Sequence, residues 1–294
     1  MTHPPRGSAL PRTVYINGSY VPEPEAQISI FDRGFLFGDG IYEVSAVIGG
    51  HLIDNDLHLD RLERSLRELD IPMPISRSEI VFMQKTLIER NELVEGVVYL
   101  QVTRGSEDRS FDYSEALKPN LVAFTQAKKL QNTAAHGDGI KVGLVDDIRW
   151  ARRDIKTTML LAQVQAKRQV KAEGCAEAWM VQDGFITEGA SSTAFIITQA
   201  GKIVTRPNSK ATLPGCTRLA VLQAAAAYGL QVEERLFTAD EAYLASEAFL
   251  TSASSFVTPV VEIAGHRIGE GKPGPITRHI QQIYLELALK QSAA

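Results

Sequence analysis

The sequence contains only two cysteines, Cys175 and Cys216, among its 294 residues, and they form no CxxC pair. This scarcity argues against a disulfide framework and favours a reducing compartment, so we expect a cytoplasmic protein. No apolar run is long enough to span a bilayer, and the start of the chain lacks the apolar core of a signal peptide. The net charge is only −4, from 31 basic and 35 acidic residues, so we expect neither a nucleic-acid partner nor a membrane partner.

Several signatures of catalytic sites are also missing. The six histidines are not paired at the spacing of metal ligands, so we expect no metal site. The chain has no G-x-S-x-G element of a serine hydrolase, no Walker loop and no G-x-G-x-x-G after a strand. The sequence therefore does not support a serine hydrolase, a P-loop nucleotide-binding protein or a dinucleotide-binding enzyme.

The composition is that of a globular protein, with 44% hydrophobic and 22% charged residues in a chain long enough for two domains. The expected fold class is mixed α+β, with much antiparallel sheet in two lobes. We expect a flexible tail at 1–12, a small N-terminal α/β domain at 13–127, a polar linker at 128–139 and a large C-terminal domain at 140–294.

Two dipeptides predict tight β-hairpins. Asn17-Gly18 and Asp183-Gly184 each join two β-prone runs, and both supply the positive φ values that a type I′ turn requires. The second hairpin is expected to open an antiparallel meander of four strands across residues 177–205. Other strands are expected at 97–105, at 120–127 and, around a loop, within 247–268.

Helices are predicted from apolar periodicity and from their caps. Residues 58–69 place four leucines on one face, and Ser76 and Glu79 have the spacing of a capping box for a helix at 76–91. Further helices are expected between Lys156 and Gly174, at 216–229 and at 275–291. The last of these should turn four side chains inward, Ile276, Ile280, Ile283 and Leu287.

Lys156 lies in "RRDIKTTMLL" (152–161), just before residues that are expected to form a helix. It can be a solvated charge at a helix start, or an amine that a site holds for chemistry. The local sequence leaves both interpretations open.

The segment "LPGCTRLAVL" (213–222) has the pattern of an anion site. A Pro-Gly turn leads directly into a helix, whose first free N–H groups and dipole favour an anion. Arg218 in the first turn is unfavourable unless an anion balances it. The alternative is an ordinary helix entry with an exposed arginine, and the local sequence favours neither.

Glu188 ends a strand in "FITEGASS" (185–192), on the same side as Ile186. A carboxylate on an apolar side is costly unless a cation meets it, and a solvated strand end is the simpler interpretation of Glu188 alone. Lysine, anion site and carboxylate together match the needs of pyridoxal phosphate: an amine for its aldehyde, donors for its phosphate and an anion beside its ring nitrogen.

With these features the sequence resembles the fold-type IV pyridoxal-phosphate enzymes, most closely the D-amino-acid transaminases. The similarity extends from about Tyr15 to the C-terminal helix. It is carried by "FDRGFLFGDGIYEV" (31–44), "HLDRLERS" (58–65), "YLQVTRG" (99–105), "DIRWARRDIKT" (147–157), "GCAEAWMV" (174–181), "TEGASS" (187–192), "LPGCTR" (213–218) and "TSASSFVTPV" (251–260).

The resemblance implies a two-domain fold-type IV architecture whose C-terminal domain binds pyridoxal 5′-phosphate, in a homodimer that acts on amino acids and 2-oxo acids. It implies that Lys156 forms the Schiff base with the cofactor and shuttles the proton, and that Glu188 binds the pyridine nitrogen. The other implied site residues are Arg61, Cys216 and Thr217 on the phosphate, Ser252 near the cofactor, Leu213 on its ring, Tyr42 against the substrate and Arg109 on the substrate carboxylate.

Two of these assignments have local alternatives, and one further residue of the motifs is not expected to be catalytic. Periodicity alone would not select Arg61 over the other arginines of its helix, and Tyr42 could be a core aromatic residue. Asp39, in "RGFLFGDG", is expected to form a turn and not to take part in catalysis.

The expected reaction transfers the amino group of a D-amino acid such as D-alanine to a 2-oxo acid such as 2-oxoglutarate, and "YEV" (42–44) favours this group. Phe111 stands where D-amino-acid members often have a histidine, which leaves the substrate range open. The alternatives are an (R)-selective amine transaminase, a branched-chain L-amino-acid transaminase, an aminodeoxychorismate lyase, and a cofactor-binding protein without turnover.

Overall fold

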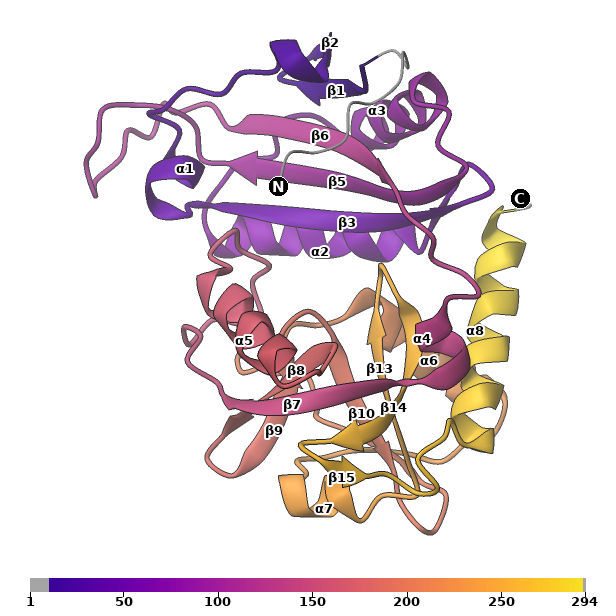
Figure 1. The fold of residues 1–294 in the computed structure, drawn as a ribbon. Helices are drawn as coiled ribbons and strands as arrows, with labels where there is room; N and C mark the ends of the chain where they lie inside the picture. Colours follow the sequence, from indigo (N-terminus) through magenta and orange to yellow (C-terminus); the bar gives the residue numbers. More distant parts are fainter. Residues whose placement is uncertain (1–10, 293–294) are drawn as a thin grey trace.

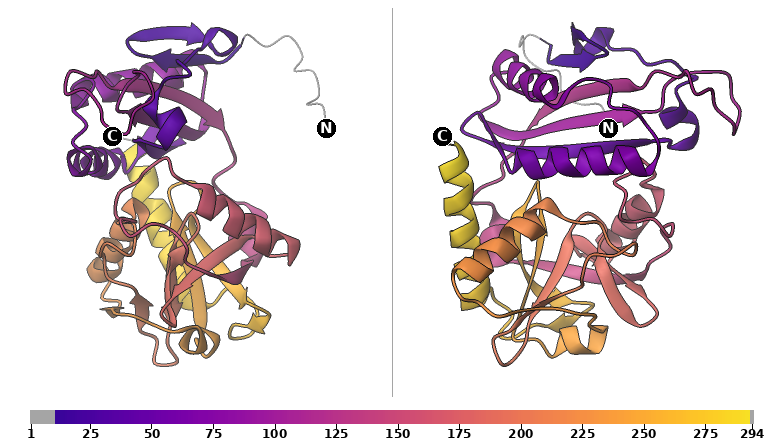
Figure 2. Two further views of the ribbon diagram at one scale, coloured as in Figure 1. Left: turned by 90° about the vertical axis from the view of Figure 1, so that its left-hand side faces the viewer. Right: turned by 180° about the vertical axis from the view of Figure 1, so that it is seen from behind.

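The computed structural model describes residues 11–292, so most of the tail expected at 1–12 lies outside the described residues. Two sheets lie on either side of helix α2 (Asn55–Glu68), one above it and one below it in Figure 1. The two further views in Figure 2 show the same arrangement. The fold is mixed α and β, as expected.

The first sheet has six strands, and every pairing in it is antiparallel. Its first hairpin turns at Asn17 and Gly18, whose φ values of 46° and 95° confirm the predicted turn. Its strands are, in sheet order, β2 (Ser19–Pro22), β1 (Thr13–Ile16), β6 (Asn120–Ala127), β5 (Glu95–Thr103), β3 (Gly40–Ile48) and β4 (His51–Ile53).

Helices α2 and α3 (Arg77–Arg90) share an apolar core with this sheet. Leu59, Leu62 and Leu66 of α2 are buried in it, as their spacing predicts. The capping box at the start of α3 is present as predicted, whereas α2 begins three residues earlier than its apolar pattern indicated.

The second sheet has nine strands and mixed pairing. Its path runs β12 (Val232–Glu234), β11 (Ile203–Thr205), β10 (Thr193–Ile197), β13 (Glu247–Ser252), β14 (Phe256–Ile263), β7 (Ile140–Asp146), β8 (Glu177–Gln182) and β9 (Phe185–Gly189), and β15 (His266–Arg267) pairs with β14.

The meander expected at 177–205 is wrong. The hairpin of β8 and β9 forms as predicted at Asp183-Gly184, but it lies at one edge of the sheet, and β10 lies between β11 and β13. All five residues of β10 are buried. A strand that is buried on both faces is typical of a sheet interior. In a meander β10 would pair with β9, but in the structure it pairs with β13 instead.

Three long helices accompany the second sheet: α5 (Leu161–Ala172), α6 (Cys216–Ala227) and α8 (Pro275–Ser292). Ile280 and Ile283 of α8 are buried as predicted, but Leu287 is 37% exposed, so its predicted inward position is wrong. The segment expected to be a linker contains a short helix, α4 (Ala134–Asp138). The remaining short elements are η1 (Glu23–Glu25), α1 (Arg33–Phe37) and α7 (Ala239–Tyr243).

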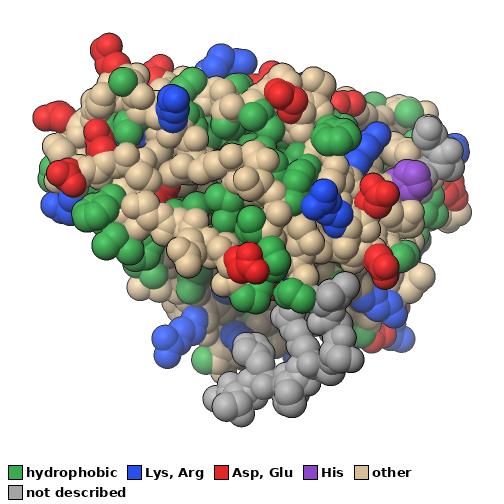
Figure 3. Space-filling view, turned by 90° about the horizontal axis from the view of Figure 1, so that it is seen from above, with side chains coloured by type: hydrophobic (Ala, Val, Ile, Leu, Met, Phe, Trp, Pro, Cys, Tyr) green, Lys and Arg blue, Asp and Glu red, His purple; other side chains and the backbone are tan. Residues whose placement is uncertain are grey.

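The upper surface carries charges of both signs. Seen from above, acidic and basic side chains lie scattered among hydrophobic and other groups (Figure 3). In the described part of the chain, no helix combines the length and the apolar character needed to cross a membrane.

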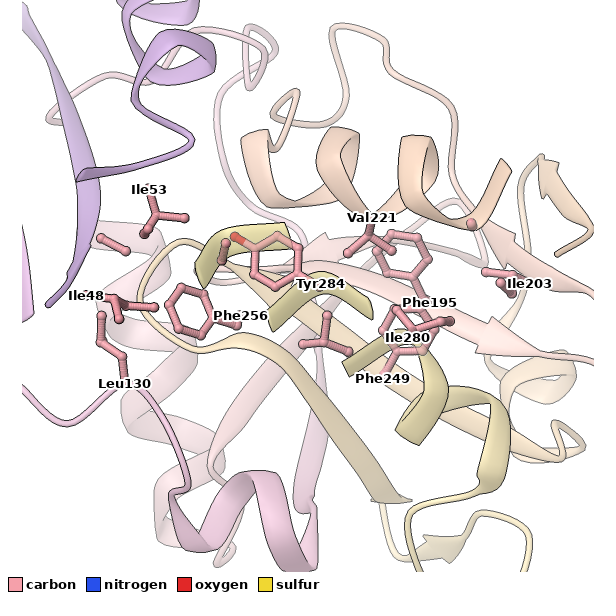
Figure 4. Packing of buried hydrophobic residues seen from close by; sticks show 14 of the residues in the cluster. Ile48, Ile53, Leu130, Phe195, Ile203, Val221, Phe249, Phe256, Ile280 and Tyr284 are labelled. Carbon is pink, nitrogen blue, oxygen red and sulfur yellow. The ribbon is translucent and has the colours of Figure 1, made fainter. Parts of the chain in front are cut away.

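One apolar core joins the two sheets. Ile48 and Ile53 from the first sheet pack in the same cluster as Phe195 and Phe249 from the second, with Tyr284 of α8 among them (Figure 4). Helix α8 therefore stabilises both parts of the molecule. We propose that the segments that form the two sheets, 13–127 and 140–294, are the two domains.

Candidate active site

A cavity of about 190 Å³ lies where the two sheets face each other. Its lining combines basic, acidic and hydroxyl side chains with the start of α6. Eight of the nine residues implied by the sequence lie in this lining: Tyr42, Arg61, Lys156, Glu188, Leu213, Cys216, Thr217 and Ser252. The exception is Arg109.

Lys156 is partly buried and lies outside any helix, because α5 begins only at Leu161. The interpretation of Lys156 as a charge at a helix start is therefore wrong. The backbone N–H of Tyr42 donates to the Lys156 carbonyl at 3.0 Å, and the adjacent Thr157 forms a β-bridge with Ile41. These contacts hold the lysine segment against β3 and place the Lys156 Nζ 4.1 Å from the centroid of the Tyr42 ring.

Two further aromatic rings stack in sequence on the side chain of Tyr42. Its ring stacks on Tyr99 at a centroid distance of 5.5 Å, and Tyr99 stacks on Phe124 at 4.8 Å. The Tyr42 side chain is only partly buried, so it is not simply a core aromatic residue. Lys156 and Tyr42 form one wall of the cavity.

Glu188 is 4% exposed and paired, so the interpretation as a solvated strand end is wrong. The Arg149 Nη1 donates to the Glu188 Oε1 at 2.6 Å, and the Leu213 N–H lies 3.1 Å from both carboxylate oxygens. Arg149 in turn forms an ion pair with Asp147 at 2.7 Å. Burial raises the pKa of Glu188, and Arg149 acts in the opposite direction.

The sequence interpretation did not include Arg149. It lies within "DIRWARRDIKT", one of the motifs of the resemblance, but no local pattern connects it with a carboxylate 39 residues away. A buried carboxylate is unfavourable without a cation beside it, and Arg149 is the cation that pairs with Glu188 here.

Arg61 is held by two further residues that the sequence interpretation missed, Glu43 and His58. The Arg61 Nε and Nη2 donate to the two Glu43 carboxylate oxygens, each at 2.8 Å, and the His58 Nδ1 lies 2.7 Å from the Glu43 Oε2. All three side chains are buried. This bidentate pair orients Arg61, whose Nη1 donates to the Pro214 carbonyl at 2.8 Å beside the start of α6.

The pKa of His58 makes stability depend on pH. Burial lowers this pKa, but Cys216 and Glu43 outweigh burial and raise it from 6.5 to about 9. A raised pKa in the folded state contributes stability that is fully present below pH 6.5 and is lost as the pH rises through about 9.

Between pH 6.5 and about 9 we therefore expect the free energy of unfolding of the chain to fall. The fall should be about 1–3 kcal/mol larger than that of a His58→Gln variant. Urea unfolding of both proteins at the two ends of the range, at one fixed cofactor concentration, measures the difference. Equal losses in the two proteins would show that His58 is not the source.

The start of α6 has the geometry of an anion site. Its N-cap, Gly215, provides no side chain to cap the helix, so the first N–H groups remain available to a bound group. A Cβ at Gly215 would lie 2.8 Å from the Thr193 hydroxyl oxygen, so only glycine lets the backbone approach this closely. Cys216 and Thr217 follow, both buried and both in the cavity lining.

The argument from Arg218 to a bound anion is wrong. Arg218 is 3% exposed, and its guanidinium group pairs with Glu234 and donates to the Arg206 carbonyl at 3.1 Å. The anion that balances this cation therefore belongs to the chain itself. The alternative of an exposed arginine is wrong as well.

Two other residues have roles that local sequence did not show. Ser252 ends β13, and its hydroxyl pairs with that of Ser255 at 2.7 Å. Asp39 lies in a tight turn, as expected, because the Gly40 N–H donates to the Gly38 carbonyl at 3.0 Å. Its partly buried carboxylate also accepts hydrogen bonds from Arg33 at 2.9 Å and Arg104 at 2.8 Å, so it joins an ion cluster that the sequence did not indicate.

Arg109 is not brought to the cavity within one chain. It lies on the 104–119 loop, most of which is exposed from Ser106 onward, with its guanidinium carbon 5.4 Å from the Phe37 ring and 5.7 Å from the Phe111 ring. Arg33 holds this loop by donating to the Ser110 carbonyl at 2.7 Å. Phe111 is 81% exposed.

The residues in the cavity fit pyridoxal 5′-phosphate. Lys156 offers an amine, Glu188 a buried carboxylate for the ring nitrogen, and the uncapped start of α6, with Arg61 beside it, a cationic pocket for the phosphate. Among the described residues, no group of three or more His, Cys, Asp or Glu side chains could hold a metal ion.

Known proteins resemble the chain over nearly its whole length. The family described as Amino-transferase class IV matches residues 40–263. The D-alanine aminotransferase of Bacillus licheniformis is 37% identical over 285 residues, which are 95% of this chain and 98% of the relative. The D-alanine aminotransferase of Staphylococcus aureus strain MSSA476 is 36% identical, over 92% of this chain and 95% of the relative.

A solved structure shows the same fold at lower identity. The branched-chain amino acid aminotransferase of Escherichia coli superimposes with a TM-score of 0.89 at 23% identity, over 95% of each chain. The chain belongs to the class IV aminotransferases, the pyridoxal-phosphate enzymes of fold type IV.

Proposed function

We propose that the chain is a transaminase that moves the amino group of a D-amino acid such as D-alanine to a 2-oxo acid such as 2-oxoglutarate. The observation that carries this proposal is the 34–37% identity to D-alanine aminotransferases over 92–95% of the chain. The similar branched-chain aminotransferase structures are 22–24% identical, a level that supports the fold alone.

Bound pyridoxal phosphate supplies an aldehyde that takes up the amino group and a ring that withdraws electron density from Cα. In the proposed reaction, the Lys156 Nζ removes the proton from Cα of the donor and later delivers a proton to Cα of the acceptor. The Tyr42 ring lies under this nitrogen and keeps it directed into the cavity.

Glu188 holds the ring nitrogen of the cofactor in its protonated form. The contacts from Arg149 and from the Leu213 N–H orient the carboxylate for this role and satisfy its buried oxygens. Arg61 and the N–H groups of Cys216 and Thr217 bind the phosphate, while Ser252 and the Leu213 side chain complete the cofactor pocket.

We further propose that the enzyme is a homodimer in which the 104–119 loop of one chain completes the cavity of the other. Exposed apolar side chains lie on both surfaces, Phe35 and Phe111 near the loop, and Leu161 and Val164 on α5 beside the cavity lining. Figure 3 shows hydrophobic side chains among acidic and basic ones at its left edge, the end at which α1 and the loop lie in Figure 1. A second chain would bury these groups and bring in Arg109. A cytoplasmic location is also part of the proposal, supported by two free cysteines.

The donor test uses the absorbance of the bound cofactor while D-alanine, L-leucine and (R)-1-phenylethylamine are added in turn to the unmodified protein. We expect D-alanine to convert the cofactor fastest and the (R)-amine weakly, because Phe111 makes the pocket less strict than a histidine would. Faster turnover of L-leucine than of D-alanine would overturn the proposed donor class.

Arg109→Ala is expected to lower kcat/KM for D-alanine by about 10–100-fold, because the variant loses charge-assisted hydrogen bonds to the donor carboxylate. The loss for (R)-1-phenylethylamine should stay within a few-fold, because this donor has no carboxylate. Similar losses for both donors would show that Arg109 supports the loop and not the carboxylate.

Mixing Arg109→Ala protein with Lys156→Ala protein tests whether Arg109 acts on the site of the other chain. A mixed dimer then contains one site with an intact lysine from one chain and an intact arginine from the other. We expect D-alanine activity to rise well above that of either variant after exchange of chains. Activity that stays at the level of the Arg109→Ala protein would place Arg109 in the site of its own chain.

A further inference from the structure

A chain of polar contacts connects α8 with the start of α2. Tyr284 is 3% exposed, and its hydroxyl donates to the Asp54 Oδ2 at 2.7 Å. Gln291, nearly two turns further along α8, donates from its Nε2 to the Asp54 Oδ1 at 3.0 Å and accepts from the Asp54 N–H at 2.8 Å. Three hydrogen bonds therefore hold Asp54 against α8.

Asp54 is the N-cap of α2, but its side chain makes no capping hydrogen bond. An aspartate at this position normally caps the helix. Here its φ is 53°, in the left-handed region, and its carboxylate turns to α8 instead. The Asp54 carbonyl still accepts from the His58 N–H at 3.2 Å, so Asp54 is joined to the turn of α2 that leads to Arg61.

Tyr284 also packs against α6, because its side chain lies in the same apolar cluster as Val221 and Ala225 of that helix. Burial and Asp54 raise the pKa of Tyr284, while Thr217 acts in the opposite direction. Figure 4 shows the Tyr284 ring between Ile53, the residue before Asp54, and Val221, one turn beyond Thr217. One side chain thus contacts both elements that form the phosphate end of the cavity.

We propose that Tyr284, Asp54 and Gln291 are positioning residues that align the two halves of the phosphate site, Arg61 on α2 and the N–H groups at the start of α6. This inference rests on the proposed role of those two groups. The backbone N–H donors of α6 move only when the helix moves, and the Arg61 side chain is fixed by its two hydrogen bonds to Glu43. Both halves therefore bind the phosphate well only if α2 and α6 are correctly placed relative to each other. The contacts of α8 therefore set affinity for the phosphate and leave the chemistry at Lys156 unchanged.

The test compares the binding of two cofactor forms to the full-length chain freed of cofactor: pyridoxal 5′-phosphate and pyridoxal, which lacks the phosphate. Tyr284→Phe removes one hydroxyl and keeps the ring in the core. We expect the Kd for pyridoxal 5′-phosphate to rise about tenfold in this variant, and the Kd for pyridoxal to stay within twofold. At saturating cofactor, kcat should equal that of the unmodified protein.

Two further variants complete the design. Gln291→Ala, at the exposed end of α8, should shift the Kd in the same direction by about threefold, and it remains informative if Tyr284→Phe folds poorly. Tyr243→Phe is the matched control, because this tyrosine stacks on His266 away from the cavity lining, and it should change neither Kd.

An unchanged Kd for pyridoxal 5′-phosphate in both the Tyr284 and the Gln291 variants would overturn the inference. Equal losses for the two cofactor forms would overturn it as well, since Tyr284 would then support the whole cavity. No amino acid is present in these titrations, so their outcome is separate from that of the donor test. A wild-type chain that binds both forms equally well would instead overturn the assignment of the phosphate site itself.

Discussion

Lys156→Ala is expected to lower the rate of transamination by at least about 10⁴-fold, because the variant loses both the amine that engages the cofactor and the base that moves the Cα proton. The structure places this nitrogen over the Tyr42 ring, and no second lysine of residues 11–292 lies in the cavity lining. Single-turnover kinetics with D-alanine measure the loss. Added methylamine should restore part of the activity, because it replaces the missing amine.

The matched control for Lys156→Ala is Lys171→Ala, on the exposed face of α5, which should keep full activity. The Lys156 variant should still bind the cofactor, because Arg61, Glu188 and the start of α6 are untouched. Substantial turnover in the Lys156 variant without an added amine would remove this residue from its proposed role.

Glu188→Gln is expected to keep the fold and the cofactor but to slow turnover by about 30- to 1000-fold, roughly 2–4 kcal/mol in the barrier. A neutral amide does not hold the ring nitrogen protonated, so the charge that develops at Cα is less stabilised. The substitution also leaves Arg149 with Asp147 as its remaining carboxylate partner.

The measurements for Glu188→Gln are kcat at saturating D-alanine and the absorbance spectrum of the bound cofactor, both of which should change. Glu173→Gln, at the exposed end of α5, is the matched control and should alter neither. An unchanged rate in the Glu188 variant would mean that the carboxylate on the ring nitrogen is another residue.

The elements that the sequence predicted correctly depend on neighbouring residues. The hairpins at Asn17-Gly18 and Asp183-Gly184 follow from positive φ values that these residues adopt readily, and the capping box of α3 needs only Ser76 and Glu79. Such features form within a few residues of each other, so the chain elsewhere has little influence on them.

The prediction of a meander failed because strand pairing is not local. The partner of β10 is β13, about 50 residues further along the chain, and burial of β10 on both faces favoured that position over the edge beside β9. Arg218 is a similar case. Its first-turn position indicated that an anion was needed, but only the folded chain shows that Glu234 supplies it.

The site residues likewise fall into those that local motifs identified and those that only the fold revealed. The resemblance of short motifs named Lys156, Glu188 and Arg61, and the fold brings all three to one cavity. It did not name their partners Arg149, Glu43 and His58, because each pairing depends on how strands and helices from distant segments meet.

The sequence by itself therefore determined the family and the cofactor and named eight residues of the cavity lining, since these are carried by motifs of contiguous residues. Only the tertiary structure decided which carboxylates meet which arginines and where Arg109 lies. It also decided that Tyr284 of α8 donates a hydrogen bond to Asp54 beside α2 and packs in one cluster with Val221 of α6. The physical reason is that buried charges and polar groups must find partners, and the partner that is available depends on packing between segments far apart in the chain.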